Sequence, residues 1–194
     1  PHMGRDPVYI ASQIVTALQS IVSREIEPLS PAVITVGAFH SGTKHNIISD
    51  RADLQLTVRA NDEDTRAQLL AAIERIAVNT GRAHGLPEEM PVQVAVSEGT
   101  PVTNNDPALA RRLNAALQRD LGNEVLIPWQ QRGMGAEDFA YFVAEEYGVP
   151  GYYFAVGGTP QAAFDAAAAG GPPVPSHHSP LFKIAPRESV TLGT

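Results

Sequence analysis

The chain contains no cysteine, so it can form neither a disulfide bond nor a thiolate zinc site from its own residues, although this absence does not identify a cellular compartment. Basic residues are also scarce, with 14 Lys and Arg against 21 Asp and Glu and a formal net charge of −7. The sequence has neither a basic stripe nor an RNP-like aromatic pattern, and we therefore expect no nucleic-acid partner.

Long apolar runs are lacking as well. No stretch approaches the roughly 18 consecutive apolar residues of a membrane-spanning helix, so we expect no membrane partner. We separately expect a cytoplasmic location. Hydrophobic residues nevertheless make up 43% of the 194 positions and charged residues 18%. This composition is typical of a folded globular protein, and the length suits one large domain or two small ones.

The first half of the chain alternates between helix and strand patterns. Asp6-Pro7 is a helix-start signal, and apolar residues then recur at helical spacing to about Arg24. Segments 32–39, 52–60 and 91–99 have the alternation or β-branched content of strands, and a further helix begins near residues 61–64. The order α-β-β-α-β predicts a ferredoxin-like unit whose first strand is missing, with both helices on one face of an antiparallel sheet. We expect this strand to come from upstream sequence.

The second half has a different pattern. After a linker at 101–105, the sequence predicts a helix over 106–122, a short strand over 124–129, and a glycine turn that opens a helix over 133–148. A buried strand over 149–158, a long unstructured loop over 159–176 and a terminal strand complete the prediction. We place the division between two lobes near Thr100.

Two adjacent histidines stand in the stretch "PPVPSHHSPLFKI". A histidine held in a rigid turn can present a neutral imidazole to a metal ion, but carboxylates or further histidines must complete the ligand shell. Exposed loop histidines also occur without any function, and local sequence alone does not separate the two interpretations.

A second motif is "GMGAEDF", in which Gly133 and Gly135 flank a turn. Free backbone N–H groups at a helix start can bind an anion or a carbonyl oxygen. Alternatively, Glu137 and Asp138 only complement the helix dipole.

The third motif is the pair Asn46 and Arg59, which lie before and at the end of the strand over 52–60. An amide and a guanidinium presented together can hold a carboxylate, because the guanidinium fork matches its two oxygens. We expect the two side chains to meet at one rim of the sheet. The alternative is an arginine that is simply solvated on the open face of the sheet.

Taken in order, "PHMGRDP", "HNIISD…TVR", "GMGAEDFAYF" and "HHSPLFKI" resemble the dinuclear metal-dependent aminoacylase/carboxypeptidase family, and most closely its branch of hippurate hydrolase and indole-acetyl-amino-acid hydrolases. The resemblance spans essentially the whole chain. It implies an α/β fold with an α+β lid: a ferredoxin-like lid and dimerisation domain at 1–99, followed at 100–194 by the C-terminal portion of a metallopeptidase-like α/β catalytic domain.

The resemblance also implies an activity, which is hydrolysis of the amide bond of N-acyl amino acids by an enzyme that binds two divalent metal ions (Zn, Mn, Co or Ni). The general base and most metal ligands would lie upstream, so no catalytic residue is assigned in this chain. His178 would be a metal ligand, with His177 as the alternative. Asn46, Arg59, Gly133, Gly135 and Glu137 would bind substrate. Ser49 stands where the family usually has proline.

The resemblance further implies a homodimer formed through the lid domain. Two other interpretations are that the chain is a catalytically incomplete fragment, or that it is a small ligand-binding module built on a ferredoxin-like unit.

Overall fold

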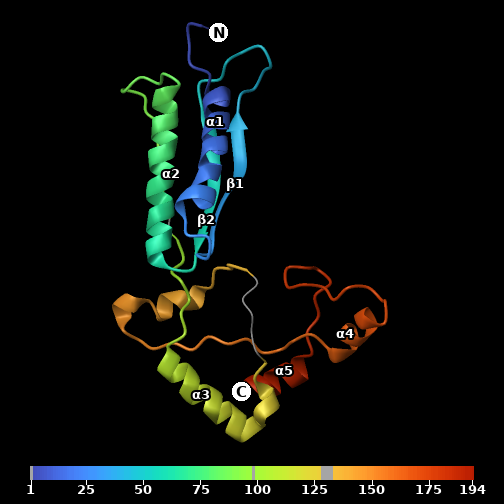
Figure 1. Cartoon of the computed structure of the whole chain (residues 1–194). Coiled ribbons are helices and arrows are strands. Elements are labelled where there is room, and N and C mark those ends of the chain that lie inside the picture. Colours follow the sequence, from blue (N-terminus) through green and yellow to red (C-terminus); the bar gives the residue numbers. More distant parts are fainter. Residues whose placement is uncertain (1, 98, 128–132) are drawn as a thin grey trace. The chain divides into compact units, whose positions relative to one another are not determined.

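The computed structural model describes residues 2–97, 99–127 and 133–194 (Figure 1). The chain divides into two compact units, residues 1–151 and residues 152–194. The elements of the first unit are α1 (Pro7–Ser20), the π-helical turn η1 (Ile21–Glu25), β1 (Ala32–Ser41), β2 (Ala52–Ala60), α2 (Glu63–Ala83), α3 (Pro107–Leu121) and the 3-10 turns η2 (Asn123–Val125), η3 (Asp138–Phe142) and η4 (Glu145–Tyr147). The second unit contains α4 (Gln161–Ala168) and α5 (Pro186–Gly193).

The helices of the first unit begin at the predicted signals. The Asp6 carboxylate accepts hydrogen bonds from the backbone N–H groups of Val8 and Tyr9, with Pro7 in the first turn of α1. Asp62 caps α2 by accepting hydrogen bonds from the backbone N–H and the hydroxyl of Thr65, at 2.7 and 2.8 Å. Such caps satisfy backbone donors that the first turn of a helix leaves unpaired.

The strands β1 and β2 form an antiparallel hairpin whose register runs from the Ala32–Ala60 pair to the Ser41–Ala52 pair. The register shifts between Val36 and Ala38, which leaves Gly37 as the extra residue of a β-bulge. The hairpin confirms the two strands predicted at 32–39 and 52–60.

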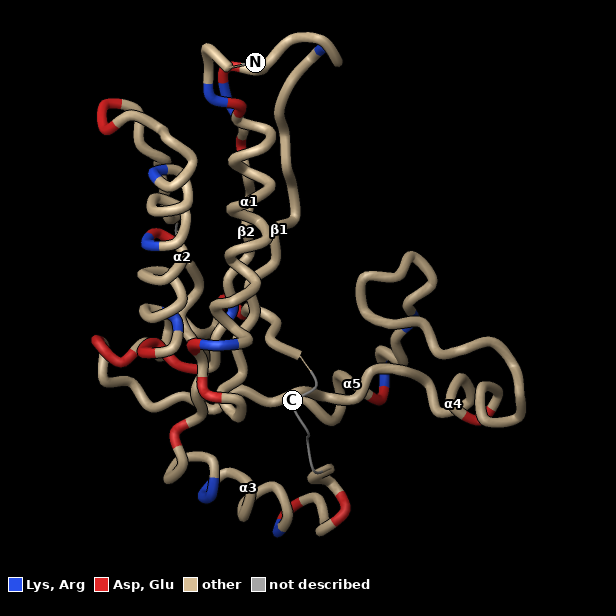
Figure 2. Tube along the Cα trace, turned by 45° about the horizontal axis from the view of Figure 1, so that its top comes forward, with Lys and Arg blue, Asp and Glu red and all other residues tan. Residues whose placement is uncertain are grey.

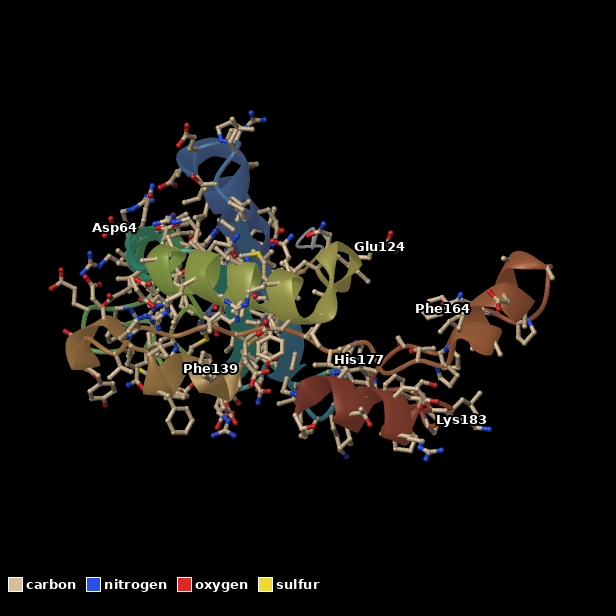
Figure 3. The ribbon with its side chains drawn as sticks, turned by 90° about the horizontal axis from the view of Figure 1, so that it is seen from below. Asp64, Glu124, Phe139, Phe164, His177 and Lys183 are labelled. Atoms are coloured by element: carbon tan, nitrogen blue, oxygen red, sulfur yellow. The ribbon has the colours of Figure 1, made fainter. Side chains whose placement is uncertain are left out.

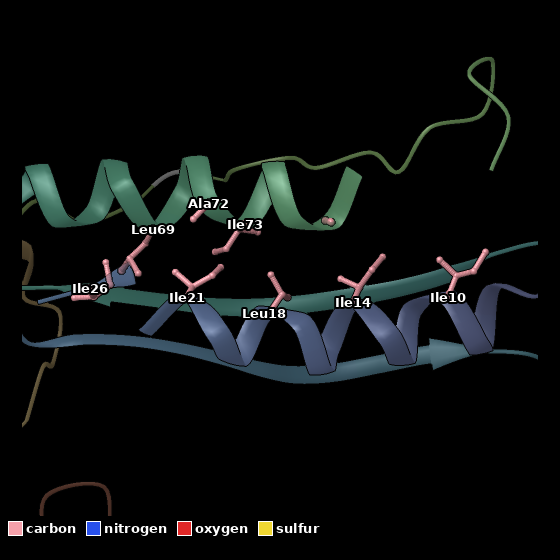
Figure 4. Close-up of a cluster of buried hydrophobic side chains, with 9 residues drawn as sticks. Ile10, Ile14, Leu18, Ile21, Ile26, Leu69, Ala72 and Ile73 are labelled. Carbon is pink, nitrogen blue, oxygen red and sulfur yellow. The ribbon is translucent and has the colours of Figure 1, made fainter. Parts of the chain in front are cut away.

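The core lies between the two helices and one face of this hairpin (Figure 4). Leu18, Ile21 and Leu69 are the largest fully buried side chains. Helical spacing places further apolar residues of α1 on the same side, and the residues of the hairpin that pack on this cluster are Ala32, Ile34, Val36, Leu54, Leu56, Val58 and Ala60. The structure therefore confirms the prediction that both helices cover one face of the sheet.

The strand predicted at 91–99 is absent from the structure. Residues 91–97 form no strand, residue 98 lies outside the described residues, and the sheet of the described chain has two strands. A segment becomes a strand by pairing with a neighbouring strand, and within the described residues β1 and β2 pair only with each other. Without such a neighbour the segment has no ladder to join, although Val92 still packs against the core.

The predictions for residues 124–158 are also wrong in detail. Residues 123–125 form the 3-10 turn η2, and residues 126 and 127 follow without strand structure, while residues 128 and 129 lie outside the described residues. The helix expected after the glycine turn is reduced to η3 and η4, and no strand occurs over 149–158. A buried strand requires neighbouring strands, and the described part of this segment has none.

In the second unit, α4 occupies part of the loop predicted at 159–176, and α5 replaces the predicted terminal strand. Pro186 at the first helical position is a start signal that favours α5. Within the described parts of the chain, no helix has the length and apolarity that crossing a membrane requires.

Candidate functional site

Arg59 lies near the end of β2, directly opposite Val33 of β1. Its neighbours in the strand, Val58 and Ala60, pack against the core, so alternation turns Arg59 to the open face of the sheet. There its guanidinium Nη1 donates a hydrogen bond to the backbone carbonyl of Met134. This contact joins the hairpin to the predicted glycine turn.

An open surface cavity of about 500 Å³ lies at this contact. Its lining residues are Pro31, Val33, Arg59, Asn61, Gly133, Met134 and Gly135. Arg59 is the one ionisable group among these lining residues, all of which belong to the described first unit. The arrangement can attract an anionic group to a partly apolar pocket.

Gly133 and Gly135 line the same cavity as Arg59, and their binding of substrate stays a prediction. Neither glycine is needed for space, because an added Cβ would meet no atom within 4 Å. Glu137 precedes η3 and does not line the cavity. Since η3 has only five residues, it lacks the stacked peptide dipoles of a longer helix and makes no anion site by itself.

Asn46 lies at the other end of the hairpin, in the loop between β1 and β2 (Figure 1). The distance along β2 from residue 52, where the loop ends, to Arg59 is about 23 Å at about 3.3 Å per residue. The expectation that Asn46 and Arg59 meet at one rim of the same sheet is therefore wrong. A hairpin with a straight ladder holds residues at its two ends apart.

Ser49 organises the loop that contains Asn46. Its hydroxyl donates to the carbonyl of Arg51 at 2.9 Å and accepts from the backbone N–H of Gly42 at 3.3 Å. The hydroxyl of Ser41 donates to the same Arg51 carbonyl at 2.6 Å. A serine thus closes the turn here by hydrogen bonds.

The two histidines lie in the second unit, in a turn that precedes α5 (Figure 3). The backbone N–H of Ser179 donates to the carbonyl of Ser176, and that of Phe182 donates to the carbonyl of Ser179. The ring of His177 stacks on the ring of Phe182, with centroids 5.5 Å apart and an interplanar angle of 14°. The turn engages His177 in packing, which leaves His178 as the better candidate ligand.

The residues present do not form a complete metal site. No three His, Asp or Glu side chains of the described chain are close enough together to hold a metal ion. A structural zinc site has four protein ligands and a catalytic zinc site has three. Any site that uses His178 must take its other ligands from elsewhere.

Four lining residues of the cavity were missed by the sequence analysis: Pro31, Val33, Asn61 and Met134. Val33 could have been found from the antiparallel pairing that sets it opposite Arg59, and Asn61 from its position two residues after Arg59. The family resemblance assigns Gly133, Gly135 and Arg59 to one substrate site, but no local sequence pattern indicates that residues 133–135 approach the hairpin.

Comparisons with known proteins match residues 1–84 to the family described as peptidase dimerisation domain of M20 proteins. YhaA of Bacillus subtilis is 34% identical over 193 residues, which are 100% of this chain and 45% of YhaA. N-acetyldiaminopimelate deacetylase of Streptococcus pneumoniae is 36% identical over 151 residues, covering 77% of this chain and 38% of the deacetylase. Thermostable carboxypeptidase 2 of Saccharolobus solfataricus is 33% identical over 157 residues, which are 81% of this chain and 37% of the carboxypeptidase.

Solved structures share the fold. A protein from methicillin-resistant Staphylococcus aureus superposes with a TM-score of 0.78 at 24% identity, over 99% of this chain and 45% of that protein. YXEP of Bacillus subtilis, described as a dinuclear metal binding peptidase from the M20 family, has a TM-score of 0.65 at 22% identity, over 97% of this chain and 43% of YXEP. The chain thus spans less than half the length of the relatives that it matches.

Proposed function

The chain belongs to the M20 family of peptidases and amidohydrolases, and from this premise we propose that it is part of an enzyme that hydrolyses the amide bond of N-acyl amino acids. The comparisons support the broader class, since the named relatives include a deacetylase and a carboxypeptidase. Both of these names describe hydrolysis at an amide bond. Hippurate hydrolase is one activity within this class.

The observation that carries the proposal is the cavity at Arg59. A guanidinium on the wall of a partly apolar pocket is suited to hold the carboxylate that every N-acyl amino acid carries. The backbone of Gly133 and Gly135 lines the same cavity and offers polar groups close to the arginine. We propose these residues as the carboxylate end of the substrate site.

Asn46 then serves a different site from Arg59. The two side chains are separated by the length of β2, which exceeds the span of a small substrate. In a homodimer built on the dimerisation domain, the loop that contains Asn46 can reach the active site of the partner subunit while Arg59 acts in its own. Glu137 does not line the cavity, and we keep it as a proposed substrate-binding residue that follows the glycine turn in sequence.

We propose His178 as one ligand of a divalent metal ion, with His177 as the alternative. The other ligands and the general base would come from the rest of the enzyme, because this chain supplies no complete site. Two divalent ions, such as Zn, Mn, Co or Ni, would provide an activated water when bound. On this proposal residues 1–99 form the lid and residues 100–194 the C-terminal part of the catalytic domain.

The test is hydrolysis by the intact enzyme in the presence of divalent ions. Release of free amino acid from N-acetyl-L-leucine, with much weaker hydrolysis of N-acetyl-L-leucinamide, is the expected result. Binding of the acid without hydrolysis, under every metal condition, would favour the ligand-binding module instead. Equal hydrolysis of the acid and the amide would show that the carboxylate is not recognised.

A further inference from the structure

A second open cavity, of about 390 Å³, lies where α1 and the π-helical turn η1 meet α2, and we call it the helix groove. The polar part of its lining includes Glu25, Arg75 and Asn79, and the apolar part consists of Ala17, Ile76 and Ala83. These residues belong to the helices, whereas Arg59 lies on the open face of the sheet. The helix groove is therefore separate from the Arg59 cavity, and the proposed function gives it no role.

An ion pair between Arg75 and Glu25 lies in the wall of the helix groove. Nη2 of Arg75 is 2.5 Å from Oε2 of Glu25, and the two side chains are 52% and 34% exposed. Backbone contacts hold the glutamate in place. The N–H of Ile26 closes the π-helical turn by donating to the carbonyl of Ile21 at 3.2 Å. The side-chain amide of Gln68, in α2, donates to the carbonyl of Glu25 at 2.9 Å.

This ion pair leaves part of each charged group available. Among the contacts of the described residues, it engages one nitrogen of Arg75 and one oxygen of Glu25. A guanidinium has five N–H donors and a carboxylate has two oxygens, so both partners can form further charge-assisted hydrogen bonds. The helix groove thus offers a positive group directly beside a negative one.

Two adjacent opposite charges match a zwitterion. In a free α-amino acid the carboxylate and the ammonium group are attached to the same carbon, so both can reach the pair at once. The carboxylate on Arg75 and the ammonium group on Glu25 would complete a ring of alternating charges. A ligand that enters the groove then keeps neither of its charges without an opposite one, which would be strongly unfavourable.

The rest of the helix groove suits an apolar side chain of such a ligand. Ala17, Ile76 and Ala83 supply its apolar surface, and burying apolar surface of the ligand against them is favourable. The volume lies at the lower end of the range of about 300–1,000 Å³ found for small-molecule sites. The groove is therefore sized for a small ligand.

We propose that the helix groove binds a free α-amino acid with an apolar side chain through Arg75 and Glu25. An N-acyl amino acid carries no ammonium group, so the groove distinguishes the amino acid that the proposed reaction releases from the substrate that it consumes. Binding in the groove does not require the proposed function and is tested without turnover.

The experiment titrates L-leucine into the intact, metal-loaded enzyme and records methyl NMR spectra of the isoleucine δ1 groups. Ile76 lines the helix groove and reports on it. Ile10 is the control, because it lies in the same core near the other end of α1 (Figure 4). L-leucine should shift the Ile76 signal in a saturable manner and leave the Ile10 signal in place.

Two analogues that the enzyme cannot hydrolyse separate the two charges. 4-Methylpentanoate is leucine without the ammonium group, and 3-methylbutylamine is leucine without the carboxylate. Each should bind about tenfold more weakly than L-leucine, or worse, because one charge-assisted hydrogen bond is lost. Glu25→Gln and Arg75→Gln should weaken L-leucine binding by a similar factor. The analogues keep the test decisive if a variant does not fold.

Glu63 and Arg66 provide the matched control variants. They form an exposed ion pair in the same helix, with 2.6 Å between Nε and Oε2, and neither lines the helix groove. Glu63→Gln and Arg66→Gln should leave the affinity for L-leucine unchanged.

The proposal would be overturned by an Ile76 signal that does not move, by an equal shift of Ile10, or by equal affinities for L-leucine and both analogues. Binding that survives unchanged in Glu25→Gln and Arg75→Gln would overturn it as well. An enzyme that binds L-leucine in the groove but hydrolyses no N-acyl amino acid would refute the proposed function alone.

Discussion

At the scale of single residues, Arg59 has two possible partners. In the structure its guanidinium donates to the carbonyl of Met134. A guanidinium has five N–H donors, and one carbonyl accepts only part of them, so the fork can also bind a carboxylate in the cavity. A lysine in its place has a compact ammonium group and cannot reproduce the planar fork that binds both oxygens of a carboxylate.

We therefore expect Arg59→Lys to lower kcat/KM of the intact enzyme for N-acyl amino acids by about ten- to hundredfold, because a lost charge-assisted hydrogen bond contributes roughly 1.5–3 kcal/mol. The measurement is steady-state kinetics on an acid and its neutral amide. The loss should be much smaller on the amide, which has no carboxylate to hold. An equal loss on both would mean that Arg59 supports the fold through Met134 and does not contact substrate.

A second prediction at this scale separates the two histidines. His178→Ala should remove most of the bound metal and most of the activity of the intact enzyme, whereas His177→Ala should have a much smaller effect. The reason is that the His177 ring is already stacked on Phe182. Metal content by elemental analysis, measured beside activity, checks it. Loss of metal in His177→Ala alone would identify His177 as the ligand.

Candidate functional residues could be predicted from the sequence where they belong to a recognisable motif. Arg59 and the glycines at 133 and 135 were singled out, and the structure places them in one cavity. Asn46 was placed wrongly because spacing along a chain does not show at which end of a hairpin a residue lies. Val33 was missed because it is an ordinary strand valine until its cross-strand neighbour is known.

At the scale of elements, the helices differ in how much of their apolar surface is buried against other elements, and this difference decides how much each contributes to stability. The apolar stripes of α1 and α2 are buried against the hairpin. By contrast, α3 has no buried residue within the described chain. The core of the dimerisation domain therefore carries most of the stability of the first unit.

Leu69→Ala should destabilise the first unit by about 2–5 kcal/mol, since Leu69 is fully buried and truncation leaves a cavity. Leu70→Ala is the matched control, because the neighbouring side chain is only half-buried and should cost much less. Chemical denaturation monitored by circular dichroism measures both. Similar losses would contradict the packing of α2.

The cap of α2 predicts a dependence on pH. Hydrogen bonds from the backbone N–H of Thr65, and then from its hydroxyl, hold the pKa of Asp62 below its usual value of 3.8. A lowered folded-state pKa means that the carboxylate stabilises the fold above the unfolded pKa and that this stabilisation is lost as the pH falls through the folded pKa.

Asp62→Ala should therefore lower the Tm at neutral pH, and the difference from wild type should shrink in acid, below about pH 4. Asp64→Ala, which removes an exposed carboxylate from the same first turn, is the control. Thermal melts of all three proteins from pH 7 to pH 3 test this. A difference that stays constant with pH would exclude the Asp62 carboxylate as its source.

Elements were predictable from the sequence where their partners are present. The hairpin and both of its helices were found because periodicity reports burial, and these elements bury each other. The segments at 91–97 and 149–158 have strand composition but no described ladder to join. Composition indicates what a segment can form, whereas pairing decides whether it does.

At the scale of the whole molecule, the chain spans less than half the length of the relatives that it matches. Its first 84 residues match a dimerisation domain. The edge strand β1 contains no Lys, Arg, Asp or Glu, and its trace is free of charged residues in Figure 2. An uncharged edge is open to pairing with a second strand.

We expect the intact enzyme to be a homodimer at micromolar concentration, with β1 of each subunit at the interface. Sedimentation velocity measures this state. Thr35→Lys, which places a charge on β1, should weaken the dimer about tenfold or more, and Thr57→Lys on β2, a strand that already carries Asp53 and Arg59, should not. A wild-type protein that sediments only as a monomer would refute the prediction.

The bulge at Gly37 has a further consequence for the edge of β1. An uncharged outer strand can template open-ended aggregation, in which each added strand exposes a new one. The extra residue between Val36 and Ala38 interrupts the regular spacing of backbone donors and acceptors. A second copy can therefore pair with a short straight stretch but not with the full length of the strand, which favours a closed pair over a growing fibril.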